Sequence, residues 1–191
     1  ADATKDTWQD TGTKLVCDVA YEAGLRKILI TDLYFDELIR YSSGKLIGSN
    51  EEDRYATQEE MDADIAERLS IYKDVPGFYG VIMIDEPKYP DFDNYALVAK
   101  SVKRALPDVF LYHNLFYGFE SGISYYTDVE AWQEEYGQKP TLTEAFNDYL
   151  CSFLEKTGAK NLAIDIYPFC DLPEERVKEF FSNIQILRNA C

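Results

Sequence analysis

Apolar and polar residues alternate along this chain in two patterns. In five segments the apolar positions recur every three or four residues, which is the period of a helix with one buried face. Between these segments lie four short, nearly continuous apolar runs, typical of strands buried on both faces of a parallel sheet. The alternation predicts βαβ crossovers and therefore an α/β fold. The helical segments are 11–23, 57–73, 92–105, 142–157 and 173–190, and the strand segments are 27–31, 79–84, 109–112 and 161–164.

Local signals mark several helix ends and the faces that should be buried. Thr57 and Glu60 form a capping box at the start of segment 57–73, while Gly24 and Gly158 follow the ends of two other helices. We expect each helix to bury its apolar stripe against the sheet. The stripes are Leu15, Val16 and Val19; Met61, Ile65, Leu69 and Tyr72; Tyr95, Val98 and Val102; Phe146, Tyr149, Leu150 and Phe153; and Val177, Phe180, Phe181, Ile184 and Leu187.

Each predicted strand ends in side chains that can take part in chemistry. In parallel sheets and barrels, ligands bind at the carboxyl ends of the strands, so we expect these side chains to meet at one site. The long segments 33–56 and 115–140 leave from the same edge and would wall this site. A structural role stays open for each, because a strand-end aspartate often caps the next helix and the histidine could be a hydrogen-bonded core residue. The residues are Asp32, Asp85, Glu86, His113, Asn114, Asp165 and Tyr167.

Charge and hydropathy restrict the partners. The 191 residues carry a formal net charge of −16, which argues against nucleic acid or an anionic membrane because phosphate groups require a basic surface. No apolar run approaches the roughly 18 residues needed to span a bilayer. No signal-peptide pattern is present, although the chain begins at Ala1 without Met, so an upstream segment could be missing. We expect no membrane insertion and a secreted or cell-surface protein, with a cytoplasmic location as the alternative.

Metal and nucleotide sites have no signature in the sequence. His113 is the only histidine, and the four cysteines show neither metal-ligand spacing nor a C-x-x-C pair. No glycine-rich phosphate-binding motif follows any predicted strand. We therefore expect neither a metal nor an organic cofactor. Cys17 and Cys151 fall on apolar helix faces, as buried free thiols do, and a disulfide among Cys17, Cys151, Cys170 and Cys191 stays open.

Three segments, taken in order, resemble the retaining (β/α)8-barrel glycoside hydrolases. The apolar run 77–84 followed by Asp85-Glu86-Pro87 is similar to their fourth strand, where Asn-Glu-Pro or Asp-Glu-Pro carries the general acid/base. Tyr112-His113-Asn114-Leu115 and Asp165-Ile166-Tyr167-Pro168-Phe169 are similar to elements at the next two strands of the Asp-Glu-Pro members. The resemblance spans roughly residues 14 to 170, and the order of the three elements is more specific than the tripeptide alone.

This resemblance implies a TIM-type barrel of which only about four strands, the third to the sixth, are present. The chain would be one partial domain over 1–191 with no internal linker. A complete barrel takes about 250 residues, so the remainder of the barrel or a partner chain would cover the two sheet edges. Glu86 would be the general acid/base of O-glycoside hydrolysis, with the nucleophile of the seventh strand outside the chain. We therefore expect the isolated chain to be inactive.

The resemblance also assigns neighbouring residues to a poly- or oligosaccharide substrate. Asp85 stands where the broader group has an Asn that contacts the sugar 2-hydroxyl. Aromatic side chains in segment 115–140 could stack on sugar rings or could simply pack locally. The expected substrate-binding residues are Asp32, Asp85, His113, Asn114, Asp165, Tyr167 and Trp132, and further stacking candidates are Tyr117, Tyr125 and Tyr126.

Two other hypotheses stay open. The strand-end ligands Asp32, Glu86, His113 and Asp165 could instead hold Mg²⁺ or Mn²⁺ in a barrel isomerase or aldolase, because these ions prefer oxygen ligands. Alternatively, the chain could belong to a non-catalytic carbohydrate-binding barrel. The presence or absence of a carboxylate on the seventh strand separates this last hypothesis from the first.

Overall fold

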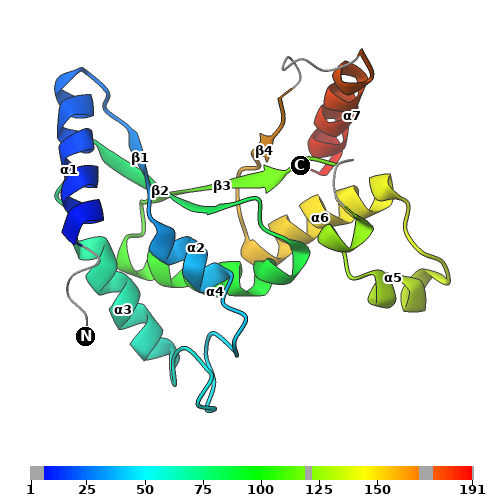
Figure 1. Cartoon of the computed structure of the whole chain (residues 1–191), viewed down its shortest axis with the longest axis horizontal. Coiled ribbons are helices and arrows are strands. Elements are labelled where there is room, and N and C mark those ends of the chain that lie inside the picture. Colours follow the sequence, from blue (N-terminus) through cyan, green and yellow to red (C-terminus); the bar gives the residue numbers. More distant parts are fainter. Residues whose placement is uncertain (1–6, 119–121, 168–173, 191) are drawn as a thin grey trace. The chain divides into compact units, whose positions relative to one another are not determined.

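The structure, a computed structural model, describes residues 7–118, 122–167 and 174–190 (Figure 1). It is an α/β protein with a four-stranded sheet in the order β1-β2-β3-β4. The strands are β1 (Ile28–Thr31), β2 (Phe78–Asp85), β3 (Phe110–Phe116) and β4 (Ile164–Asp165). The helices are α1 (Thr7–Glu22), α2 (Leu33–Ile39), α3 (Gln58–Ser70), α4 (Phe92–Ala105), α5 (Val129–Tyr136), α6 (Leu142–Thr157) and α7 (Glu174–Ala190).

The four predicted strands are present, and the predicted α/β fold with a parallel sheet is confirmed. β1 runs parallel to β2, with Ile30 opposite Val81, and β3 runs parallel to β4, with Leu115 opposite Ile164. Parallel pairing puts the carboxyl ends of paired strands at the same edge, which is where the polar strand-end residues were predicted to meet. Closure of these strands into a barrel stays a prediction.

Internal contacts divide the chain into two compact units. The first comprises Ala1–Met83 with Leu97–Tyr112, and the second comprises Ile84–Ala96 with His113–Cys191. β2, β3 and α4 each contribute residues to both units. The prediction of one partial barrel domain therefore stays a prediction, and each unit is described by itself.

The first unit has an aliphatic core built on α3. Thr57 caps this helix, accepting a hydrogen bond from the Glu60 N–H at 3.2 Å, while the Glu60 carboxylate reaches back to the N–H of Ala56 at 2.8 Å. The predicted cap is confirmed, with the reciprocal bond one residue earlier than the usual box. The apolar stripe predicted for segment 57–73 is fully buried: Met61, Ile65 and Leu69 lie on α3, and Tyr72 follows its end.

The second unit has a largely aromatic core. Phe92 and Tyr95 on α4 both pack edge-on against Phe153 on α6, with ring centroids 5.1 Å apart in each pair. On α7, buried Asn183 accepts a hydrogen bond from the backbone N–H of Gly118 at 2.7 Å. The predicted stripe of α6 is fully buried, and it consists of Phe146, Tyr149, Leu150 and Phe153.

Two helices expose faces that were expected to be buried. Leu15, Val16 and Val19 on α1 are 62%, 66% and 58% exposed, and Phe181 and Ile184 on α7 are 64% and 38% exposed. The helical period was predicted correctly in both places, but the burial of these residues was wrong. An amphipathic period shows which face of a helix is apolar, not whether a neighbour covers it.

The two long polar segments contain short helices that the sequence pattern did not reveal. α2 begins directly after β1 with Asp32 as its N-cap, and α5 begins at the N-cap Asp128 and ends at Gly137, whose φ is 73°. Of the described helices, none is long and apolar enough to cross a membrane.

The cysteines divide between described and undescribed parts of the chain. Cys17 is a buried free thiol, as predicted, and Cys151 is a free thiol that is only half-buried. Pro168, Phe169, Cys170 and Cys191 lie outside the described residues, as do Phe119 and the expected start of the last helix at 171–173. The possible disulfide involving Cys170 or Cys191 therefore stays open.

Candidate active site at the carboxyl ends of the strands

Glu86 occupies an unusual turn immediately after β2. Its φ is 47°, and it is the one non-glycine residue with a positive φ in the described part of the chain. Its N–H donates to the carbonyl of Asn114 at 2.6 Å, and its own carbonyl accepts a hydrogen bond from the Tyr125 hydroxyl at 2.6 Å. A residue in this left-handed region interrupts the alternation of the strand directly after Asp85. Asp85 and Glu86 are therefore not related by the simple alternation of a regular strand.

Asp85 and Asn114 meet across neighbouring strands. The Asn114 amide donates to the Asp85 carboxylate with an Nδ2–Oδ1 distance of 2.9 Å. Asp85 is exposed and Asn114 is half-buried, so the pair lies at the surface of the unit, where a ligand can reach it. The two residues that the resemblance placed beside Glu86 are thus joined to each other, and the Asn114 backbone is joined to Glu86.

Asp165 and Tyr167 bring a third carboxylate and a phenol to this end of the sheet. The Tyr167 hydroxyl donates to Asp165 Oδ2 at 3.2 Å, and Tyr167 is 62% exposed. This hydrogen bond raises the pKa of Tyr167, and the negative charges of Asp165, Asp85 and Glu86 raise it further.

His113 is a core histidine of the second unit. It is fully buried, with its Nδ1 3.2 Å from the Tyr95 hydroxyl and its ring centroid 4.5 Å from that of Phe153. Burial lowers the pKa of His113 to about 4, so the imidazole is neutral at pH 7. These contacts fit the structural alternative, and we do not carry His113 into the proposed binding site.

Asp32 belongs to the first unit, where both of its carboxylate oxygens accept hydrogen bonds from neighbouring residues. Its side chain is 1% exposed and accepts hydrogen bonds from Arg68 at 2.7 and 3.0 Å and from the Tyr72 hydroxyl at 2.9 Å. It also accepts the Tyr34 N–H at 3.1 Å as the N-cap of α2. Asp32 therefore has the structural role that was left open for strand-end aspartates: it caps the next helix and pairs with Arg68. Asp32 is not carried into the proposed site.

The aromatic residues proposed to stack on sugar rings are buried or half-buried. Tyr126 is fully buried, with its hydroxyl on the Tyr117 carbonyl at 2.7 Å, so it has no face for a sugar ring. Tyr125 is half-buried, and its hydroxyl donates a hydrogen bond to the backbone carbonyl of Glu86. Trp132 on α5 is half-buried. Its ring packs on Tyr136, also on α5, with centroids 4.6 Å apart, and among the described residues no ring contact joins Trp132 to the strand ends.

Contacts that sequence reasoning missed surround the Glu86 turn. The Tyr149 hydroxyl donates to the carbonyl of Pro87, one residue beyond the carbonyl that Tyr125 holds. Tyrosines in segment 115–140 and on the helix 142–157 were visible in the sequence, but a backbone acceptor leaves no sequence signal. Among the described residues, no group of three or more His, Cys, Asp and Glu side chains could hold a metal ion.

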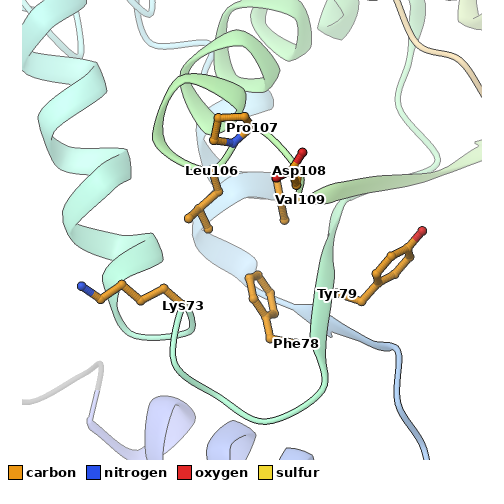
Figure 2. A pocket seen from close by; sticks show the side chains of 7 residues that line it. All are labelled: Lys73, Phe78, Tyr79, Leu106, Pro107, Asp108 and Val109. Carbon is orange, nitrogen blue, oxygen red and sulfur yellow. The ribbon is translucent and has the colours of Figure 1, made fainter.

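In the first unit, a hollow of about 410 Å³ lies next to the amino-terminal residues of β2 and β3 (Figure 2). It is formed around Phe78 at the start of β2 and by Leu106 and Val109 before β3, and Figure 2 shows the Leu106 and Phe78 side chains pointing toward each other. In parallel α/β enzymes the chemistry belongs to the carboxyl ends, while the amino ends serve stability. This hollow is therefore not the candidate active site.

Comparison with known proteins adds no assignment to this geometry. No family model matches the sequence, and no curated protein matches it significantly.

Proposed function

We propose that this chain provides the acid/base half of a glycoside hydrolase, with Glu86 as the general acid/base. The observation that supports this most directly is the Glu86 turn: a carboxylate at the carboxyl end of a parallel strand, in a left-handed conformation, with both backbone groups hydrogen-bonded. Backbone conformations of this cost are found mainly where function requires a fixed geometry. A polar cluster of Asp85, Asn114, Asp165 and Tyr167 lies at the same strand ends.

The proposed chemistry needs a proton at the glycosidic oxygen. In the first step the Glu86 carboxyl donates its proton to the leaving oxygen, while a second carboxylate from outside this chain would bond to the anomeric carbon and displace that oxygen. In the second step the Glu86 carboxylate takes a proton from the water that attacks the anomeric carbon and releases the second carboxylate. The reaction therefore requires Glu86 to be held at hydrogen-bond reach of one oxygen atom through both steps. A backbone that is fixed on both sides of the residue serves this requirement.

The neighbouring side chains supply matched groups for sugar hydroxyls. Asp85 and Asp165 are acceptors, and Asn114 and Tyr167 each combine a donor with an acceptor. The exposed Asp85 would accept a hydrogen bond from the sugar 2-hydroxyl, while Asn114 fixes the Asp85 rotamer by its 2.9 Å bond. Trp132 on the surface of α5 stays a candidate for a sugar ring bound further along the chain of a polysaccharide.

The second carboxylate is proposed to come from a strand beyond the four described here, with the sheet as a section of a (β/α)8 barrel. Hydrolysis takes two carboxyl groups on either side of the scissile bond. The 191-residue chain by itself should therefore not hydrolyse glycosides, and measurable turnover by it would contradict this part of the proposal.

Leaving-group dependence in the full-length protein tests the role of Glu86. Replacing Glu86 with Gln removes the transferable proton and keeps the shape of the side chain. Turnover of a substrate with a poor leaving group, such as a phenyl glycoside, should fall by about 10²–10⁴-fold. The leaving group of a 2,4-dinitrophenyl glycoside needs no proton. For this substrate the rate of the first step, the release of 2,4-dinitrophenol, should change far less.

A matched control is Glu134→Gln, on the exposed side of α5. This variant should hydrolyse both substrates as the wild type does. Equal rates of the wild type and Glu86→Gln on the phenyl glycoside would refute the proposal. Saturable oligosaccharide binding without turnover by either protein would instead establish the non-catalytic binding hypothesis.

A further inference from the structure

We propose that Tyr125 and Tyr149 are positioning residues that clamp the Glu86-Pro87 turn and thereby fix the direction of the Glu86 carboxylate. This inference rests on the proposed function for its catalytic consequence. Its structural content, the dependence of the Glu86 backbone on two tyrosine hydroxyls, stands on the geometry of the second unit.

The two hydroxyls hold consecutive carbonyl groups. Tyr125, at the end of the short 3₁₀ helix Ile123–Tyr125, donates to the Glu86 carbonyl at 2.6 Å, and Tyr149 on α6 donates to the Pro87 carbonyl. On the other side of the turn, the Glu86 N–H is bound to the carbonyl of Asn114 on β3. The peptide groups before and after Glu86 are therefore both fixed.

Packing prevents the tyrosine rings from following a movement of the turn. Tyr149 is fully buried, with its ring 5.0 Å from Phe92 and 5.4 Å from Tyr126. Tyr125 lies with its ring 5.3 Å from Phe116 and 5.2 Å from Tyr126. A tyrosine has only two side-chain torsions, so its hydroxyl is fixed once its ring is packed.

The left-handed conformation explains why a clamp is needed. At φ 47° the Cβ of a non-glycine residue crowds the backbone, and such a residue persists only where its surroundings over-determine it. Without the hydrogen bond from Tyr125, Glu86 can rotate toward the extended region, which a residue before proline prefers. The carboxylate would then move relative to a bound glycosidic oxygen.

The test compares Tyr125→Phe with Tyr126→Phe in the full-length protein. Both changes remove one hydroxyl that donates to a backbone carbonyl, but the Tyr126 hydroxyl is bound to Tyr117 and not to the turn. In Tyr125→Phe we expect Glu86 to leave the positive-φ region, measured from a crystal structure or from backbone NMR couplings. We expect kcat on a phenyl glycoside to fall by about 10–100-fold with KM within about threefold, because substrate contacts remain while the proton donor is misplaced.

The matched variant Tyr126→Phe should keep the φ of Glu86 and keep kcat within about twofold. A Tyr125→Phe protein that retains both the positive φ and the wild-type kcat would overturn the inference. So would equal losses of kcat in the two variants, because these would show a general effect of weaker packing. If wild-type protein has no glycosidase activity, the proposed function fails, and the φ of Glu86 in Tyr125→Phe still decides the clamp.

Discussion

The left-handed turn predicts that glycine at position 86 gives a more stable protein than alanine at the same position. Both variants lose the Glu86 carboxylate, so its contacts cancel when the two are compared. Alanine keeps the left-handed penalty of about 1–2 kcal/mol that glycine avoids. The glycine variant is in turn less stable than the alanine variant by about 0.5–1 kcal/mol from chain entropy, because its unfolded chain is more flexible. The φ of 47° therefore predicts a net advantage of glycine over alanine of about 0.5–1 kcal/mol.

Urea and thermal unfolding, followed by circular dichroism and Trp fluorescence, measure this difference. For a chain of this length the expected shift in Tm is about 1–4 °C. Glu134, inside α5, provides the control because a helical φ reverses the sign, and there alanine should be more stable than glycine by about 1 kcal/mol. If alanine is the more stable residue at both positions, Glu86 does not have a left-handed conformation, and the argument for a strained catalytic turn fails.

Two further predictions concern the buried polar residues. The pKa of His113 is 6.5 in the unfolded chain and about 4 in the folded protein, so the unfolded state binds more protons between these pH values. The free energy of unfolding therefore falls as the pH drops through this window, by about 3 kcal/mol in all. NMR of the only histidine in the chain should show a midpoint near 4, and a midpoint at 6 or above would contradict its burial as a neutral core residue. Arg68→Met should destabilise the protein by about 3–5 kcal/mol in urea unfolding because Asp32 stays behind as a buried, unpaired carboxylate, and Arg68→Met/Asp32→Asn should recover part of the loss. The surface pair Arg104–Asp62 is the control, since Arg104→Met should cost no more than about 1 kcal/mol, and equal losses at the two sites would refute the difference in burial.

The elements that could be predicted from sequence are those whose signals are local and repeated. α4 and α6 begin and end where the periodicity placed them, because each has several turns of apolar period, and α6 also has a Thr141 cap and a terminal Gly158 with φ 67°. α2 and α5 were missed because seven and eight residues are too few to show a period. Asp128 and Gly137 nevertheless match the residue types that begin and end helices, and their spacing could have indicated α5.

Pairings between distant residues were beyond the reach of sequence reasoning. Arg68 neutralises Asp32 from 36 positions away, and nothing in either segment indicates its partner. The strand-end clustering of Asp85, Asn114 and Glu86 was predictable because parallel topology brings carboxyl ends together. The role of Tyr125 was not, because its partner is a carbonyl oxygen, and every residue has one.

Rescue by azide tests the central claim, that Glu86 is the general acid/base, most directly. In the full-length protein, Glu86→Ala leaves water without a base in the second step, and the small cavity next to the anomeric carbon can admit an anion. We predict that azide accelerates turnover of a 2,4-dinitrophenyl glycoside by Glu86→Ala and yields a glycosyl azide, with no acceleration of the wild type. Turnover of Glu86→Ala at the wild-type rate, with no glycosyl azide formed, would contradict the account.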